Sequence, residues 1–214
     1  IMTVQNGDAV ALHGVDTAWA NTGYDGSGTT VAIIDTGIDG AHASLDDQDD
    51  DPETNDPKVI AFYDALDGSG DDGSGETEPY DDQGHGSHCA GISSGTGSIG
   101  DKPVGSGETP YRGVAPGSSL VGVKVLDSGG SGSFSEVMKG MEWTIDNQQK
   151  YNIRAASMSL GGVWLVELTQ EQEERITHLA NEMVAAGISL MIAAGNSGGY
   201  GTIGTPGAAK DVIT

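Results

Sequence analysis

The sequence is poor in several features that would point to particular protein classes. It contains a single cysteine, Cys89, so no disulfide can form within the chain. Lysine and arginine together number 9 against 32 aspartates and glutamates, and the net charge is -23. A surface of this kind repels nucleic acid and anionic membranes, so we expect neither as a partner. No apolar run approaches the roughly 18 residues that a membrane span requires.

The acidic excess supports two hypotheses about where the protein works. Acidic surfaces stay hydrated in concentrated salt, where charge repulsion is screened, so we favour a salt-adapted protein. The alternative is a secreted acidic protein with calcium sites. The first residues, Ile1-Met2-Thr3-Val4, include no basic segment followed by an apolar core, which predicts no signal peptide in this sequence. A processed secreted protein and a cytosolic protein would both begin in this way.

Short apolar runs alternate with helical patterns along the 214 residues. Runs typical of strands buried on both faces cover 29–34, 58–63, 119–126, 154–160 and 188–194, and a sixth strand begins at 211–214. Helical periodicity covers 133–150 and 169–186; Thr169 with Gln172 predicts a capping box, and Gly187 predicts the helix stop. We therefore predict one α/β domain over residues 1–214, with a mostly parallel central sheet and helices on both faces. Residues 46–82 and 95–116, rich in Gly and Ser, are predicted to form long loops.

Three polar side chains stand where predicted strands end or helices begin. Asp35 follows the run 29–34, and we interpret it as a partly buried carboxylate with a partner. His85 opens a helical run of small residues that can pack closely on the sheet. Asn196 follows the run 188–194 between glycines, where its amide can donate to a developing oxyanion. Ligands of parallel sheets bind beyond the carboxyl ends of the strands, so these side chains are candidates for one site.

These residues belong to motifs that resemble the subtilisin-like serine proteases, the subtilases. The matching stretches are Asp35-Thr36-Gly37, His85-Gly86-Ser87-His88, Gly113-Val114-Ala115-Pro116 followed by Val123-Lys124-Val125-Leu126, Met158-Ser159-Leu160-Gly161-Gly162, and Ala194-Gly195-Asn196. They occur in the family's order, and the similarity runs from about Val15 to the last residue. Any one of these motifs is weak, but five in order make a chance match improbable.

The resemblance implies a subtilisin-like fold and a role for each matching residue. Asp35 would orient His85, His85 would act as general base and then general acid, and Asn196 would be the oxyanion donor. An extended substrate would pair with the edge Gly130, Ser131 and Gly132 as an added strand. The pocket for the residue before the cut would be walled by Ser159, Leu160, Gly161, Ala193, Ala194 and Gly195, with Gly204 at its base. Leu126 and Phe134 would line a further subsite.

The sequence also departs from the family pattern. The family's nucleophile lies in a Gly-Thr-Ser segment downstream of the asparagine, and no such segment occurs here. The last residues, Val212-Ile213-Thr214, fall inside an expected core strand. We therefore expect these 214 residues to be a fragment that cannot hydrolyse peptides on its own. Ser44 stands where many members place a calcium-binding aspartate, which argues against the family's best-known calcium site.

Other residues have simpler interpretations. His88 is interpreted as a packed structural histidine, and Cys89 as a small buried thiol under the site that mercurials attack. Alternate spacing of Asp47, Asp49 and Asp51 is compatible with a structural calcium site, although a solvated acidic loop is the default interpretation. Three matches to the dinucleotide-binding glycine pattern, at 68–73, 95–100 and 199–204, are interpreted as chance because none links a strand to a helix.

The sequence thus predicts a secreted, monomeric serine endopeptidase of broad specificity. Its expected partners are extended polypeptide substrates and its own propeptide, and its chemistry requires no cofactor. A non-catalytic subtilase-like domain that binds peptides is the alternative. A nucleotide-binding α/β domain is disfavoured by the charge and by the misplaced glycine motifs.

Overall fold

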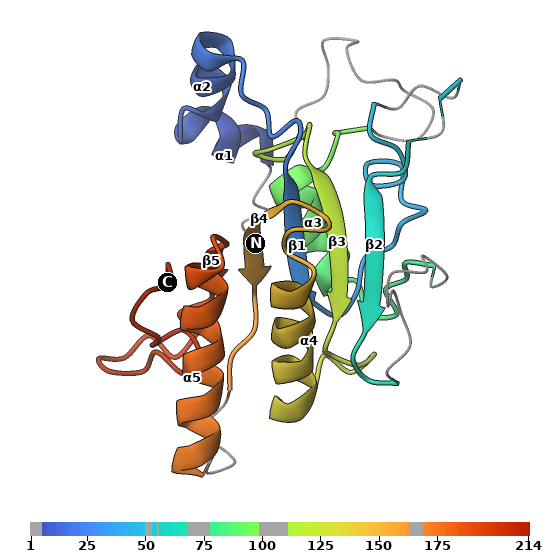
Figure 1. Cartoon of the computed structure of the whole chain (residues 1–214). Helices are drawn as coiled ribbons and strands as arrows, with labels where there is room; N and C mark the ends of the chain where they lie inside the picture. Colours follow the sequence, from blue (N-terminus) through green and yellow to red (C-terminus); the bar gives the residue numbers. More distant parts are fainter. Residues whose placement is uncertain (1–5, 50–52, 55, 68–77, 99–110, 163–168) are drawn as a thin grey trace.

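The structure, a computed structural model, describes residues 6–49, 53–54, 56–67, 78–98, 111–162 and 169–214 (Figure 1). The elements in chain order are α1 (Asn6–Leu12), α2 (Val15–Thr22), β1 (Thr30–Asp35), β2 (Val59–Asp64), α3 (His85–Ser94), β3 (Ser119–Lys124), α4 (Phe134–Asp146), β4 (Ile153–Met158), α5 (Gln170–Ala185) and β5 (Ser189–Ile192). None of the helices in these ranges is long and apolar enough to cross a bilayer.

The five strands form one sheet in the order β2-β3-β1-β4-β5, and every neighbouring pair is parallel. The predicted parallel sheet is therefore confirmed. Because all strands run the same way, their carboxyl ends share one edge of the sheet. Asp35, Asp64 and Lys124 are the last residues of β1, β2 and β3, so this edge carries three charged side chains.

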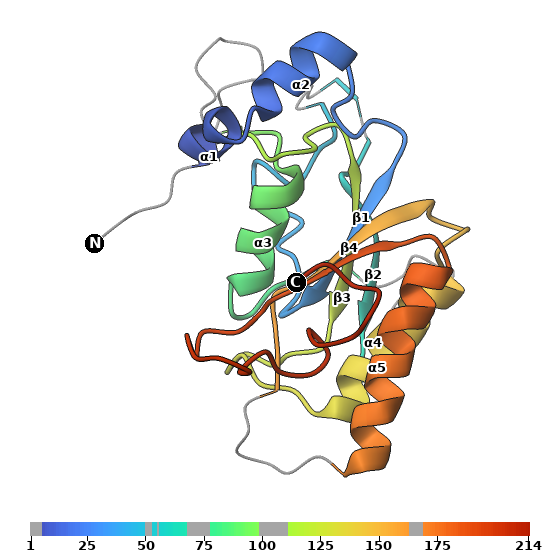
Figure 2. The same ribbon diagram turned by 90° about the vertical axis from the view of Figure 1, so that its left-hand side faces the viewer.

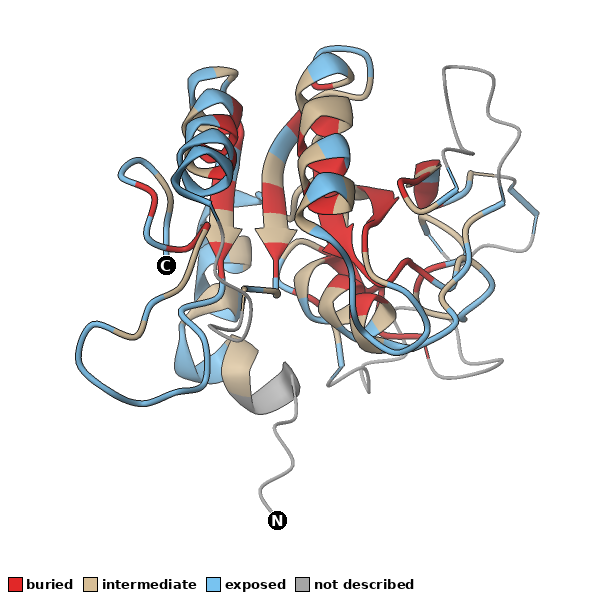
Figure 3. Ribbon diagram, turned by 90° about the horizontal axis from the view of Figure 1, so that it is seen from below, coloured by how far each residue is buried: buried red, intermediate tan, exposed pale blue. Residues whose placement is uncertain are grey.

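Helices cover both faces of the sheet, as predicted. Figure 2 shows α3 on one side of the strands and α4 and α5 on the other. All six residues of β1 are buried, because alternate side chains enter different cores. Ala32 and Ile34 pack in the core shared with α4 and α5, whereas Val31 and Ile33 pack with Ala90 of α3. In Figure 3 the buried parts of the strands lie between helices whose outer surfaces are exposed.

Capping interactions decide where the two long helices begin and end. Thr169 and Gln172 form the predicted capping box of α5, and Gly187 has the left-handed backbone expected of a helix stop, with φ 91°. A second capping box, of Ser133 with Glu136, begins α4. The predicted helix 133–150 ends earlier, at Asp146, because the Asn147 side chain donates to the Trp143 carbonyl and turns follow.

Other differences from the sequence predictions lie near the two ends of the chain. The expected strand at 211–214 is present only as a single parallel bridge between Ile213 and Met191. Helices α1 and α2 were not predicted, and α2 buries none of its side chains. A helix without a buried face has no apolar periodicity to reveal it. Both helices lie at the end of the sheet opposite the charged strand ends (Figures 1 and 2).

Candidate active site

Asp35 is a fully buried carboxylate at the end of β1. Its Oδ1 accepts a hydrogen bond from the Thr36 backbone N–H at 2.7 Å and lies 2.8 Å from Nδ1 of His85. Its Oδ2 is buried and has no hydrogen-bond partner in the described part of the chain. A buried carboxylate needs a polar partner, and the imidazole of His85 supplies one. The pair expected from the sequence is therefore in direct contact.

His85 reaches Asp35 because α3 packs directly on the loop that follows β1. A side chain at Gly86 would collide with the Gly37 carbonyl oxygen, so only glycine permits this approach. The Gly86 backbone N–H also donates to Thr36 Oγ1 at 2.9 Å. The side chain of His85 is 42% exposed, whereas that of Asp35 is 1% exposed. One member of the pair is thus sheltered from solvent, and the other is accessible from the surface.

Asp81 connects the start of α3 to the loop that follows β1 through hydrogen bonds. Its carboxylate accepts from the backbone N–H groups of Gln83, Gly84 and Ser87, from the Ser87 hydroxyl and from Thr36 Oγ1. Partial burial raises the pKa of Asp81, but the bonds from Gly84 and Ser87 outweigh it and lower the pKa to about 2. Asp81 is therefore ionised near neutral pH, and its negative charge lies at the positive end of α3.

A cleft of about 570 Å³ opens beside His85. The residues that line it are Thr36, Gln83, His85, Leu126, Gly129, Gly130, Ser131, Gly132, Phe134, Val137, Ser159, Leu160, Gly161, Gly162, Ile176, Thr205 and Pro206. The cleft thus brings the edge Gly130–Gly132, the wall Ser159–Gly161 and the imidazole of His85 together. Leu126 and Phe134, expected in a further subsite, also line it.

The remaining predicted residues lie outside this lining. Ala193, Ala194, Gly195 and Asn196 form an exposed loop after β5. Ala193 is anchored through its N–H to the Met158 carbonyl at 3.0 Å. Within the described residues, no hydrogen bond joins the Asn196 side chain to Asp35 or His85. Gly204 lies beside the cleft, since a Cβ on it would come within 3.1 Å of the Gly162 carbonyl oxygen.

Several cleft residues were missed from the sequence. They are Thr36, Gln83, Gly129, Val137, Gly162, Ile176, Thr205 and Pro206. Gln83 was detectable in principle, because it stands two residues before His85 and its Oε1 accepts the His85 backbone N–H at 2.9 Å. Thr205 and Pro206 follow an irregular glycine-rich stretch, which carries no periodicity that would relate them to a cleft.

Cys89 lies one helical turn after His85, with its Sγ 4.0 Å from His85 Nδ1. Burial, together with the charge of Asp35, raises the pKa of the thiol to about 11, although a hydrogen bond with Ser159 opposes the shift. The thiol is therefore protonated near neutral pH, which fits a packing role and not a nucleophilic one.

We expect a mercurial bound to Cys89 to abolish any activity of the protein that depends on the imidazole of His85. The added group would occupy the space beside the imidazole and push it away from Asp35. The check is residual activity after treatment with p-chloromercuribenzoate. Cys89→Ala should keep its activity under the same treatment, and inhibition of that variant would contradict the prediction.

His88 differs from its sequence interpretation. It was expected to be a packed structural histidine, but it is exposed on α3. The residues that α3 buries are the small ones Gly86, Ala90 and Ser94. His88 therefore points away from the core because the helical repeat places it on the opposite face.

The expected calcium residues lie in an acidic loop away from the cleft. Ligand oxygens of Asp47, Asp49 and Asp56 lie within 4.8 Å of one another, and Asp51 is outside the described residues. The Ser44 hydroxyl donates to the Ser98 carbonyl, so it is part of a loop contact. Calcium takes six to eight oxygens, of which these carboxylates would supply only a part. The calcium site stays a prediction.

Comparisons with known proteins agree with this geometry. The sequence profile of the subtilase family matches residues 26–214. The chain is 41% identical over 196 residues to serine protease AprX of Bacillus subtilis, covering 88% of this chain and 38% of that protein. It is 35% identical over 201 residues to subtilisin of Bacillus pumilus, covering 93% of this chain and 56% of that protein. The chain therefore spans about half or less of the length of these relatives.

A solved structure is similar as well. It is described as a crystal structure of a cold adapted subtilisin-like serine proteinase, and it superposes with a TM-score of 0.56 at 28% sequence identity. The match covers 81% of this chain and 49% of that one. The arrangement of strands and helices is thus shared with a protein of known structure.

Proposed function

This chain belongs to the subtilase family, and from that premise we propose that the protein is a serine endopeptidase that cleaves extended polypeptides. The observation that carries the proposal is the contact of a buried carboxylate, Asp35, with a solvent-accessible imidazole, His85, on the border of a cleft. A carboxylate in this position keeps the proton on Nδ1 and stabilises the imidazolium that forms during catalysis.

The nucleophile completes the proposed mechanism. No Gly-Thr-Ser segment occurs in the 214 residues, so we propose that the serine belongs to a part of the gene product that follows Thr214. In the proposed reaction, Nε2 of His85 accepts the proton of that serine hydroxyl as it attacks the peptide carbonyl. The imidazolium then donates the proton to the leaving amine. Residues 1–214 alone would lack hydrolytic activity.

Asn196 is proposed as the donor that stabilises the oxyanion of the tetrahedral intermediate. Donors of this type act on charge that appears only in the transition state, and losing one typically lowers kcat by about 10²–10³. Its exposed loop after β5 leaves the amide free to turn toward a bound substrate.

The substrate is proposed to bind as an extended strand between two backbone edges. Gly130–Gly132 would pair with one side of it, and Ser159–Gly161 would pair with the other. Main-chain hydrogen bonds of this kind depend little on which side chains the substrate carries, which supports broad specificity. Gly204, with no side chain to fill the pocket, would admit a large apolar residue before the cut.

Fluorophosphonate labelling of the complete gene product tests the proposal. We expect one serine beyond Thr214 to be labelled, and residues 1–214 alone to remain unlabelled. Peptide mapping by mass spectrometry locates the modified residue. A complete gene product that binds extended peptides but takes no label and cleaves nothing would establish the non-catalytic peptide-binding alternative instead.

We further propose that the protein is extracellular and monomeric, that it is inhibited by its own propeptide, and that it binds no nucleic acid or membrane. Its charge of -23 supports a salt-adapted protein. We expect the folded fraction to rise with sodium chloride concentration, because added ions screen the repulsion among 32 acidic residues. Circular dichroism over a salt series measures this. Full folding in low salt without calcium would contradict it.

A further inference from the structure

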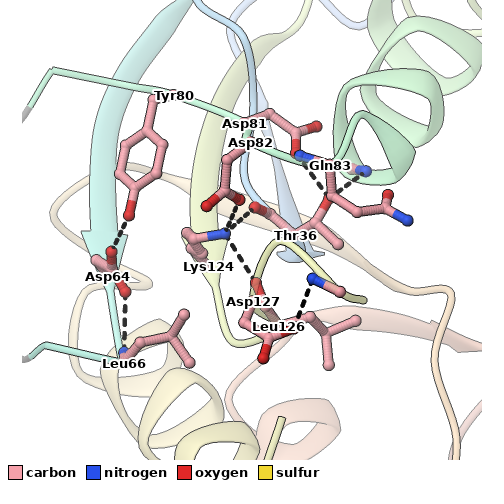
Figure 4. A network of polar contacts seen from close by, with 12 residues as sticks. Thr36, Asp64, Leu66, Tyr80, Asp81, Asp82, Gln83, Lys124, Leu126 and Asp127 are labelled. Carbon is pink, nitrogen blue, oxygen red and sulfur yellow. Dashed lines mark hydrogen bonds and ion pairs between the residues drawn. The ribbon is translucent and has the colours of Figure 1, made fainter. Parts of the chain in front are cut away.

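Lys124, the last residue of β3, carries an ammonium group that is almost completely buried, with 1% of the side chain exposed. Its Nζ donates to the Thr36 carbonyl at 2.7 Å, to the Leu126 carbonyl at 2.8 Å and to Asp82 Oδ1 at 2.6 Å. An ammonium has three N–H groups, so these three acceptors satisfy it fully. Figure 4 shows the three contacts converging on Nζ.

The three acceptors come from three segments that border the cleft. Thr36 directly follows Asp35, and Asp82 stands three residues before His85. Leu126 lines the cleft and begins the loop that leads to the edge Gly130–Gly132. Lys124 therefore connects three segments. They are the loop that follows Asp35, the segment that leads to His85, and the start of the loop that carries the predicted substrate edge.

Neighbouring groups hold the ammonium in this position. Nζ lies 5.3 Å from the centroid of the Tyr80 ring, within the range of a cation–π interaction. The Tyr80 hydroxyl in turn donates to the buried carboxylate of Asp64 (Figure 4). An arginine in this place would carry a planar fork of donors, which does not converge on one point as an ammonium does.

We propose that Lys124 is a positioning residue, which sets the distance between the Asp35–His85 pair and the edge Gly130–Gly132. This inference rests on the proposed function. The loss of the ammonium would leave two carbonyls without their donor and free the loop 126–132 to shift. A displacement of about 1 Å at a reaction centre can lower the rate on the order of 10²-fold. The effect should be greatest for substrates long enough to occupy the edge.

The chain contains a matched control for this residue. Lys58 is also fully buried, and its Nζ donates to the carbonyls of Pro116 and Ser118 at 2.7 and 2.9 Å. It directly precedes β2 and so lies at the amino end of the strands, away from the cleft. Removing either ammonium takes a hydrogen-bond donor away from two backbone carbonyls. Of these two lysines, only Lys124 donates to carbonyls that border the cleft.

The experiment compares Lys124→Met and Lys58→Met in the complete gene product. Two substrates are used: a peptide long enough to occupy Gly130–Gly132, and an ester of a single amino acid. For Lys124→Met we expect kcat/KM to fall on the order of 10²-fold for the peptide and less for the ester. For Lys58→Met we expect a similar drop in Tm and an unchanged ratio of the two kcat/KM values. Lys124→Arg should not restore the ratio, because its planar fork of donors does not converge on the three acceptors.

An unchanged ratio in Lys124→Met, or an equal change in Lys58→Met, would overturn the proposal. If Lys124→Met does not fold, Asp82→Ala replaces it, because Asp82 is 43% exposed and its loss releases the segment that leads to His85 from the ammonium. For this variant we expect a smaller fall in the ratio of kcat/KM for the peptide to kcat/KM for the ester. An unchanged ratio would overturn the proposal.

If the unsubstituted protein cleaves neither substrate, the proposed function fails separately. The affinity of the extended peptide then becomes the measurement. Weaker binding in Lys124→Met than in Lys58→Met supports the positioning role, and equal affinities overturn it.

Discussion

Replacing His85 by alanine is expected to lower the kcat of the complete gene product by about 10⁶-fold, the size of the loss known for the corresponding histidine of a subtilisin triad. His85 is the proposed proton carrier in both halves of the reaction, and no other described histidine contacts Asp35. Because its side chain is 42% exposed, the substitution opens no large cavity. The measurement is kcat and Tm on the same preparation, and Tm should change little.

His88→Ala is the control for this substitution. His88 lies on the same helix, is exposed, and faces away from the contact between α3 and the loop after β1. We expect it to retain the kcat of the unsubstituted protein. If both variants lost kcat to a similar extent, the loss would come from a disturbance of helix α3 and not from the absence of the His85 imidazole. A retained kcat in His85→Ala would refute the proposed mechanism.

Asp35→Asn should lower kcat by about 10⁴-fold, as the same change does in a serine protease triad. Oδ1 of Asp35 accepts from both His85 Nδ1 and the Thr36 N–H. The NH2 group of an amide must either face both of these donors or lie in the buried position of Oδ2, where no described group accepts its hydrogens. The first arrangement forces the wrong tautomer on the imidazole, and the second leaves buried donors unpaired. The substitution also removes the negative charge that stabilises the imidazolium. Steady-state kinetics with an extended peptide measure the loss, and KM should change little because Asp35 is not expected to contact substrate.

Asp64→Asn provides the matched comparison. Asp64 ends β2 as Asp35 ends β1, and both carboxylates are almost fully buried, at 2% and 0% exposure. Asp64 accepts hydrogen bonds from the Tyr80 hydroxyl and the Leu66 backbone N–H. It does not line the cleft. The oxygen of an asparagine can still accept from the Tyr80 hydroxyl, so we expect a loss of thermal stability with kcat retained. If both substitutions reduced kcat alike, the effect of Asp35→Asn would reflect a general disturbance of the strand ends.

The elements that could be read from the sequence are those that bury apolar side chains regularly. The strands β1 to β4 were predicted to within a few residues, because their runs are enclosed on both faces and leave a continuous apolar stretch. The capping box of α5 was recognisable from Thr169 and Gln172 alone. Helix α2 escaped prediction because it buries nothing, and the strand expected at 211–214 proved to be one bridge through Ile213.

The candidate site was predictable in part for a similar reason. Motifs around Asp35 and His85 predicted both residues, and their contact follows from the close packing of Gly86 on Gly37. The far wall of the cleft, including Thr205 and Pro206, was not predicted, because nothing local relates those residues to a strand end. Lys124 was part of a motif, yet its sequence neighbours are apolar and do not disclose three polar partners.

The sequence by itself determined the alternation of the five strands with helices, the parallel sheet and the family, since apolar periodicity, capping residues and ordered motifs are local properties of the chain. Only the tertiary structure decided that residues 35 and 85 touch, that His88 faces solvent, and that one buried ammonium joins three loops. Contacts across tens of residues depend on the order of the strands within the sheet and on how closely a helix approaches the sheet. Neither is written in any single segment, because both arise from the packing of segments against one another.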